Sequence, residues 1–492
     1  ESITMISGAM NDAQRETNYR VKKRDDLVQG MLKYIKITKQ EMMKKRAMNT
    51  VHSLLYLQPP IGVEDELRKQ VVDVTLKHLN NCKLPENEVA DTDGNTDNDD
   101  EKKEEEKAGG GEDAVAADTA LLQCMQTILV GLLETQPSVE SLCQLIFKLE
   151  YWIVSKNINE RICALETYKL LTKRFIGILR KHQDIGSSKS PQKEREKSLR
   201  NLGHYLATII PRVTDNNSKV RELALDTIQM LLFIDQLLRN PGNEKPSDEL
   251  RSLNALKKEL QNEKIAETRL QKMYYLSEIL CKLTSAEEMK TLLINLIRGV
   301  NDDDRQSALG TCKALQGILR ERALETKQYV DKLLEINLDE LKKFINDERK
   351  KNVLKQQLIS ICILTREHFD DILEILHQRN LPTLDAATIL VFKALAADIK
   401  LQRKVIDYEL NVINASPIND SGITTNVCIA TKAVQCMFTL SETSELCKSD
   451  EYYYQFFATL ITRLGTAICK KAKAKPTGAA PTADGKKKLN KD

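Results

Sequence analysis

A short pattern that recurs along the chain constrains the fold more than any other feature of the sequence. Four segments align without gaps, and each reads Ala, an apolar residue, a variable residue, Thr, and then Leu at the eighth place. A basic residue stands three places before each Ala. Internal similarity of this kind is the signature of a helical repeat protein. The alanines are Ala47, Ala164, Ala224 and Ala308, and the bases are Lys44, Arg161, Arg221 and Arg305.

The pattern fits the second helix of a HEAT unit. A small Ala lets two antiparallel helices approach closely, while the apolar positions around it fill the seam between neighbouring hairpins. The alanines are 117, 60 and 84 residues apart, so divergent units must fill the intervals. We predict an all-α fold, an α-solenoid of HEAT-like antiparallel helix hairpins.

The clearest unit runs from Leu206 to Ala224. Pro211 is expected to kink its first helix, and the polar residues from Asp215 to Ser218 are expected to form the turn and the helix cap. The second helix then begins near Val220.

The bases that precede the alanines lie near helix starts, where a positive charge opposes the helix dipole. We therefore expect each base to be held by an acidic side chain of the preceding turn. Asp215 is the candidate partner for Arg221, and Asp302, Asp303 and Asp304 are the candidates for Arg305.

Composition supports an all-α chain and narrows the class of partner. Aromatic residues, which favour strands, make up only 5% of the chain. A single compact core normally stops growing well below 492 residues, so the chain must divide into domains or extend as a solenoid. The formal net charge of +3 is too near zero to indicate nucleic-acid binding. The eleven Cys are scattered along the sequence without a CxxC pair, as expected of reduced thiols in a cytoplasmic protein. No apolar stretch is long enough to cross a bilayer.

Polar segments separate the regions of the sequence that are predicted to be helical. We predict HEAT-like helices over 1–84, a disordered acidic insert over 85–118, a solenoid over 119–469, and a disordered Lys-rich tail over 470–492. Short linkers are expected near 183–198 and 240–247.

Residues typical of catalytic and cofactor sites do not assemble into a motif. The sequence has no GxxxxGK[ST] loop, no HExxH and no GxSxG, and no two of the six His lie within four residues of each other. Runs of carboxylates such as 302–304 are more typical of caps and turns than of an acid/base pair. We predict that the chain is not an enzyme and binds no metal or cofactor.

Two basic clusters near the start are candidate contacts for an anionic membrane or an acidic partner. Exposed helix faces often carry such clusters, so a simple solvated face is the alternative. We expect the side chains of Lys22, Lys23, Arg24, Lys44 and Arg46 to be largely exposed. The clusters consist of Lys22, Lys23, Arg24, Lys44, Lys45 and Arg46.

The chain resembles the maestro HEAT-like repeat proteins. The resemblance rests on Asn18–Asp26, on Leu202–Leu206 with the unit that follows, on Gly299–Leu315, on Ile372–Leu410 and on Phe456–Leu464. It spans nearly the whole chain except the acidic insert and the tail. Members of that family are longer, so the chain is expected to be an internal segment. The resemblance implies a cytoplasmic α-solenoid scaffold that is recruited to late endosomes and lysosomes and acts in membrane remodelling or fission.

Two functions therefore remain open. The first is a scaffold that binds protein partners along the solenoid and contacts anionic membrane peripherally. The alternative is an importin-like or assembly adaptor that binds protein cargo in the cytosol. The sequence does not decide the oligomeric state.

Overall fold

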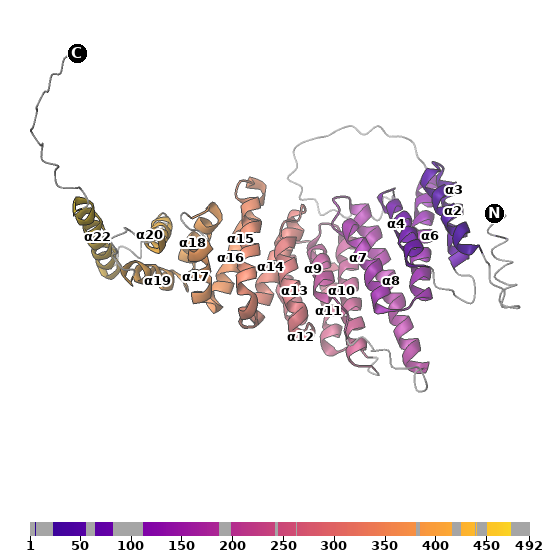
Figure 1. The fold of residues 1–492 in the computed structure, drawn as a ribbon. Helices are drawn as coiled ribbons and strands as arrows, with labels where there is room; N and C mark the ends of the chain where they lie inside the picture. Colours follow the sequence, from indigo (N-terminus) through magenta and orange to yellow (C-terminus); the bar gives the residue numbers. More distant parts are fainter. Residues whose placement is uncertain are drawn as a thin grey trace, which may run out of the picture. The chain divides into compact units, whose positions relative to one another are not determined.

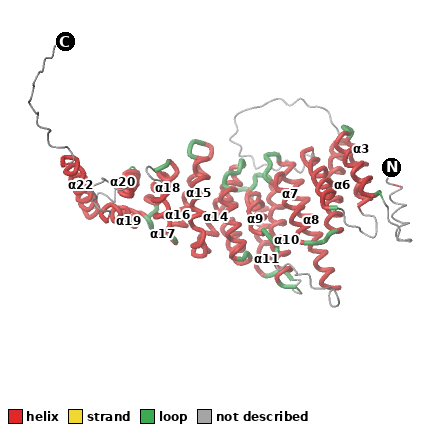
Figure 2. The backbone as a smooth tube through the Cα atoms, viewed as in Figure 1, coloured by secondary structure: helices red, strands yellow, loops and turns green. Residues whose placement is uncertain are grey.

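The protein is described here from a computed structural model, and the described residues are all helical or loop (Figures 1 and 2). They comprise residue 5 and residues 23–55, 64–81, 112–185, 198–241, 245–261, 263–379, 384–415, 425–437, 439 and 450–473. No strand occurs among them. The predicted all-α fold of stacked helix hairpins is confirmed.

The chain divides into two compact units, and the first comprises residues 1–340 and 346–360. Its helices are α2 (Arg24–Ile37), α3 (Glu41–Leu55), α4 (Asp65–Leu76), η1 (Lys77–Asn81), α6 (Glu112–Thr135), α7 (Val139–Ile153), α8 (Ile158–Ile185), α9 (Leu202–Ile209), η2 (Ile210–Thr214), α10 (Ser218–Arg239), α11 (Asp248–Gln261), α12 (Ala266–Leu283), α13 (Ala286–Gly299), α14 (Arg305–Arg322), η3 (Ala323–Tyr329) and η4 (Glu348–Lys350), with most of α15 (Val330–Phe344) and part of α16 (Lys351–Glu367).

Local sequence accounts for where these helices begin. The Asn217 side chain caps α10 by accepting a hydrogen bond from the Val220 amide at 3.1 Å. Asp304 caps α14 in the same way, accepting from the Gln306 and Ser307 amides. A side-chain acceptor satisfies backbone donors that the first turn of a helix leaves open. At Pro211, α9 gives way to the 3₁₀ segment η2, as expected of a residue without an amide hydrogen.

The hairpins of the first unit do not stack with a constant repeat. Helix α9 packs against both α7 and α13, while α10 packs against α8 and α11 and α12 packs extensively against α14. Both helices of the α11–α12 hairpin therefore lie between α10 and α14, and α9 reaches α13 directly. Regular stacking of every hairpin would instead separate α9 from α13 by one further helix.

The second unit comprises residues 341–345 and 361–492. It holds the remaining parts of α15 and α16 together with α17 (Phe369–Arg379), α18 (Ala386–Ala397), α19 (Gln402–Ala415), α20 (Thr425–Met437) and α22 (Asp450–Lys473). A buried pair joins α17 to α19, with His377 Nε2 2.9 Å from both carboxylate oxygens of Glu409. Burial raises the pKa of Glu409, against the opposing effect of the His377 hydrogen bond.

The predicted region boundaries differ from the helices in three places, and one is the first linker, predicted from about residue 183, because α8 continues to Ile185. The acidic insert was predicted to reach residue 118, whereas α6 begins at Glu112. The tail was predicted from residue 470, whereas α22 continues to Lys473. The rest of the predicted insert and tail lies outside the described residues, as do 186–197 of the first linker. At the second linker α10 ends at Arg239 and α11 begins at Asp248.

Candidate functional site

Buried ion pairs connect successive hairpins of the first unit. The Asp215 carboxylate forms an ion pair with Arg161, whose Nε lies 2.9 Å away, and it accepts a hydrogen bond from Arg161 Nη2 at 3.1 Å. Arg212 lies 3.4 Å from the same carboxylate and also pairs with Asp302, at the start of the α13–α14 turn. Arg161, Arg212 and Asp215 are 5%, 1% and 0% exposed. The series from Arg161 to Asp302, called here the charge ladder, thus runs through the interior and joins three hairpins.

The buried position of the charge ladder shifts the pKa of its member Arg212 and of the neighbouring Asp304. Burial lowers the pKa of Arg212, opposed by the charge of Asp215. Burial likewise raises the pKa of Asp304, and the nearby Asp215 charge adds to this shift. Burying a charge costs much free energy unless the charge is paired, so we interpret the charge ladder as a structural element of the scaffold.

Arg221 binds its expected partner Asp215 through the backbone. Arg221 donates to the backbone carbonyls of Asp215 and Asn216 at 2.9 Å, so the Asp215 carboxylate is free to pair with Arg161 of the preceding hairpin. Arg161 and Arg269 close their own turns in the same way, each donating to carbonyls five and six residues earlier. The repeat pattern missed Arg269 because Lys272 stands where the alanine would be.

The expected pairing of Arg305 with an aspartate of the preceding turn is wrong. Arg305 is exposed, and the three aspartates before it have other contacts. Asp302 pairs with Arg212, Asp303 lies 3.3 Å from Lys156, and Asp304 caps α14. The aspartates therefore connect this turn to earlier hairpins instead of neutralising the base beside them.

The four repeat alanines all lie within helices, namely α3, α8, α10 and α14. Ala47, Ala164, Ala224 and Ala308 are 5%, 0%, 0% and 1% exposed.

The side chains of the two basic clusters are less exposed to a membrane or an acidic partner than the sequence predicted. Lys22 lies outside the described residues, Lys23 and Arg46 are exposed, and Lys45 is half-buried. Arg24 is 7% exposed and pairs with Asp25 at 2.7 Å, contrary to the prediction. The Lys44 side chain is 12% exposed and pairs with Glu41 at 2.6 Å, again contrary to the prediction.

The spacing of residues along a helix explains why Arg24 and Lys44 are not exposed. Arg24, Val28, Leu32 and Ile35 share the buried face of α2, so the arginine lies one turn before the apolar stripe. Lys44 stands one turn after Glu41 on α3, where the carboxylate binds its ammonium group. Three consecutive bases on a helix point in different directions, so they do not form one basic patch.

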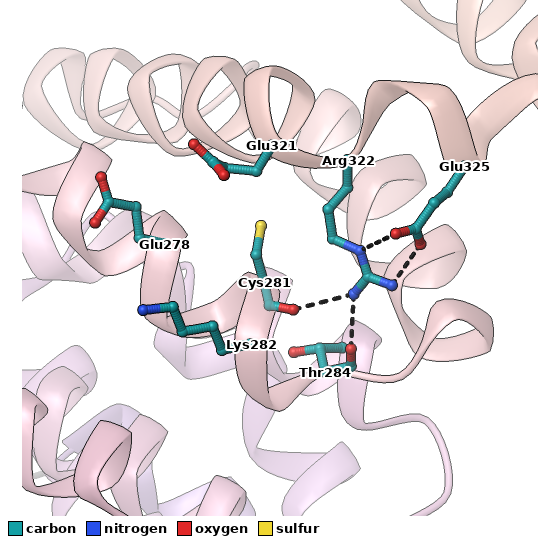
Figure 3. A pocket seen from close by; sticks show the side chains of 7 residues that line it. All are labelled: Glu278, Cys281, Lys282, Thr284, Glu321, Arg322 and Glu325. Carbon is teal, nitrogen blue, oxygen red and sulfur yellow. Dashed lines mark hydrogen bonds and ion pairs between the residues drawn. The ribbon is translucent and has the colours of Figure 1, made fainter.

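An open groove of about 660 Å³ lies between the C-terminal ends of α12 and α14. Figure 3 shows Glu278 and Lys282 on α12, Glu321 on α14, and Cys281 between these helices. Glu278, Lys282 and Glu321 are exposed. No sequence motif indicated this groove, because its residues come from helices that are distant along the chain.

One end of the groove is closed by Arg322. Its guanidinium group binds both carboxylate oxygens of Glu325 and donates to the carbonyls of Cys281 and Thr284 at 3.2 and 2.8 Å (Figure 3). The cation thereby neutralises the carbonyl end of α12. Burial raises the pKa of Cys281 to about 12, so this thiol stays protonated and is a poor nucleophile at neutral pH.

Helix α22 offers a second surface. Tyr452 and Phe456 are buried, whereas Tyr453, Tyr454 and Phe457 are 55%, 65% and 54% exposed. Leu460, Ile461 and Leu464 continue the exposed apolar face along the same helix. An apolar face of this extent is typical of a contact surface.

Two kinds of feature are absent from the part of the chain that the structure describes. No helix there is sufficiently long and apolar to span a bilayer. No group of three or more His, Cys, Asp or Glu residues in the same part is placed to hold a metal ion.

Comparison with known proteins confirms the resemblance inferred from the sequence. A sequence model of the family described as Maestro, HEAT repeats, matches residues 188–406. The chain is 25% identical over 483 residues to Maestro heat-like repeat-containing protein family member 1 of Dictyostelium discoideum, which covers 94% of this chain and 27% of that protein. Its identity to the Homo sapiens protein of the same name is 22% over 410 residues, covering 82% of this chain and 22% of that protein. The chain thus spans about a quarter of the length of these relatives.

Among solved structures, the chain is similar to the karyopherin Kap121p in its crystal structure bound to the SUMO protease Ulp1p. The identity is 16% and the TM-score 0.30, with 80% of this chain and 36% of that chain covered. A structural similarity this low carries no information about the partners of this chain.

Proposed function

We propose, because the chain carries the repeats of the Maestro HEAT family, that it is a non-enzymatic scaffold whose stacked hairpins hold protein partners. The charge ladder carries this proposal. Buried pairs such as Arg161–Asp215 and Arg212–Asp302 fix neighbouring hairpins to one another through side chains that are not available to ligands. A framework held together internally leaves its outer side chains available for contacts, as in other helical repeat proteins.

The place of action we propose is the cytoplasmic side of late endosomes and lysosomes, with a role in membrane remodelling or fission. The resemblance to the family supports this proposal. We further propose that a protein partner recruits the chain to the membrane. Two of the bases that would attract anionic lipid, Arg24 and Lys44, are already paired with Asp25 and Glu41.

Binding to anionic vesicles tests the recruitment step. Each base near an anionic surface contributes about 1 kcal/mol, so the exposed Lys23 and Arg46 support only weak binding that disappears with salt. We expect little co-sedimentation of the chain with vesicles containing phosphatidylserine at physiological salt. The double variant Lys23→Glu/Arg46→Glu should differ little from Lys327→Glu/Lys332→Glu, an equal charge change at exposed positions on η3 and α15.

Strong vesicle binding that only the first double variant removes would contradict this proposal, because it would place a lipid site in the N-terminal helices. Circular dichroism controls for the fold of both variants.

An importin-like or assembly adaptor that binds protein cargo in the cytosol is the second candidate. The groove between α12 and α14 favours it, because polar side chains line an open surface there (Figure 3). Both candidates bind proteins, and they differ in whether membranes are needed. Nucleic acid is not expected as a partner of either.

A further inference from the structure

We infer that one face of α14 is a docking surface for an extended acidic segment of a protein partner, anchored where Lys313 and Arg320 lie over the ring of Tyr274. This inference rests on the proposed function as a protein-binding scaffold, and it names the chemistry of one partner. Three observations carry it: two cations that share one aromatic ring without a carboxylate, a fixed position for that ring, and a helix face that carries bases without acids.

The two cations share the Tyr274 ring at close range. Lys313 Nζ lies 5.6 Å from the centre of the ring, and the guanidinium carbon of Arg320 lies 4.6 Å from it. Among the residues that the structure describes, no carboxylate forms an ion pair with either base. The ring attracts a cation through its face and leaves most of the N–H donors open to an acceptor. Two like charges at one ring also repel each other, and an anion bound by both would relieve that repulsion.

Packing and hydrogen bonds fix the Tyr274 ring against α14. Gly317 makes room for it, since a Cβ at this position would lie 3.3 Å from Tyr274 Cδ1. The Tyr274 hydroxyl donates to Gln316 Oε1 at 2.7 Å, and Gln316 Nε2 donates to the carbonyl of Gln356 on α16 at 2.9 Å. Gln316 is 1% exposed, so this connection is buried. The ring and its two cations are therefore in place before a partner binds, which lowers the cost of ordering them.

The same face of α14 carries a third base. Arg305 is exposed and, like the other two, forms no ion pair with the described carboxylates. Positions 305, 313 and 320 lie within about 80° of one another around the helix axis, and no acid occurs between them in the sequence. Glu321 follows Arg320, but adjacent positions differ by about 100°, and its side chain lines the groove. The face is thus basic along most of the helix.

Charge complementarity selects an extended acidic segment as the occupant. Guanidinium and ammonium groups are donors only, and carboxylates are acceptors that form charge-assisted hydrogen bonds with both. The three bases extend over roughly 22 Å of helix at the usual rise per residue, and about seven residues of extended peptide cover that distance. A chain with several acids therefore matches the surface better than a single anion does.

Binding of a fluorescein-labelled octa-glutamate peptide to the purified chain tests the surface by anisotropy. The double variant Lys313→Gln/Arg320→Gln should bind roughly tenfold more weakly, because each lost charge-assisted hydrogen bond weakens binding. Arg305→Gln removes one base and should cause a smaller loss. Glu278→Gln should strengthen binding, since it removes the acid that stands one turn after Tyr274 on α12.

Lys327→Gln/Lys332→Gln is the matched control, since it removes two positive charges at exposed positions of η3 and α15. Equal binding by this control and by the Lys313→Gln/Arg320→Gln variant would overturn the inference. To remove competition from the chain's own acids at 97–106, the assay is repeated with a variant that lacks them. Absence of peptide binding in both proteins would likewise overturn it.

Two substitutions of Tyr274 separate the role of the ring from that of its hydroxyl. Tyr274→Phe keeps a ring at the two cations and should bind the peptide nearly as well as the wild type. Tyr274→Leu removes the ring, so the bases lose their fixed positions and binding should weaken several-fold. Thermal midpoints show that both variants are folded. Equal peptide binding by folded Tyr274→Phe and Tyr274→Leu proteins would contradict an anchor at the ring.

Other occupants would give different results. Binding of a phosphoserine peptide, with no binding of octa-glutamate, would replace the acidic segment by a phosphate group and overturn the inference. Flotation with protein-free phosphatidylserine vesicles that depends on Lys313 and Arg320 would replace it by a membrane and also overturn the inference.

The peptide assay contains no membrane, so its failure is distinguishable from failure of the proposed function. Membrane recruitment that persists in Lys313→Gln/Arg320→Gln, together with absent peptide binding, would refute the α14 surface alone. Peptide binding that depends on these residues, without any protein-dependent recruitment, would support the surface and refute the endosomal role.

Discussion

Replacing Asp215 by Ala is expected to lower the free energy of unfolding by about 3–5 kcal/mol, the typical cost of leaving a buried charge without its partner. Two guanidinium groups would lose their counterion, since Arg161 and Arg212 both contact this carboxylate and are 5% and 1% exposed. The Asn217 amide would also lose the acceptor that it now finds in Asp215 at 3.0 Å. Urea unfolding followed by circular dichroism measures the change.

Asp303→Ala is the control for this prediction. Asp303 pairs with Lys156 at 3.3 Å, but the two side chains are 61% and 80% exposed. Exposed pairs contribute about 0–1 kcal/mol, so the unfolding midpoint should barely move. Similar losses in the two variants would show that Asp215 is not a buried link between hairpins.

Gly203→Ala should destabilise the first unit by at least about 1–3 kcal/mol, as overpacking of a close contact does. A Cβ at this position would overlap the carbonyl oxygen of Glu288 and lie 2.8 Å from the Leu292 amide nitrogen. Both obstacles are backbone atoms of α13, so no side-chain rotation can relieve them. The contact is made where α9 packs directly against α13. Differential scanning calorimetry would record the loss as a lower midpoint.

Two other glycines supply controls in which substitution by Ala should raise the thermal midpoint instead of lowering it. Gly30 in α2 and Gly177 in α8 have nothing within 4 Å of an added Cβ. Ala at a helical position is favoured over Gly by roughly 0.5–1 kcal/mol, so either substitution should raise the midpoint slightly. A Gly203→Ala protein as stable as these two would refute the direct packing of α9 on α13.

The sequence predicted the parts of this fold that local rules determine. The repeat pattern placed Ala164, Ala224 and Ala308 in second helices of hairpins, and the polar residues before Val220 predicted the cap of α10. These features depend on neighbours within about one or two helical turns. Arg161 and Asp215 are 54 residues apart, and nothing local shows that they meet.

The same limit explains what sequence reasoning missed on the surface. A row of bases looks exposed until the direction of each side chain is known, and Arg24 and Lys44 were predicted wrongly for that reason. The groove lies where α12 and α14 pack side by side, and its residues come from both helices. No motif in the sequence marks these residues as one surface.

The claim that the scaffold is recruited through proteins is tested most directly on isolated late-endosomal membranes. The purified chain would be incubated with untreated membranes, with membranes stripped of exposed protein by trypsin, and with protein-free vesicles of the extracted lipids, followed by flotation. We expect the chain to float with the untreated membranes only. Equal flotation with the protein-free vesicles would contradict protein-mediated recruitment, and absence from all three fractions would contradict the endosomal role.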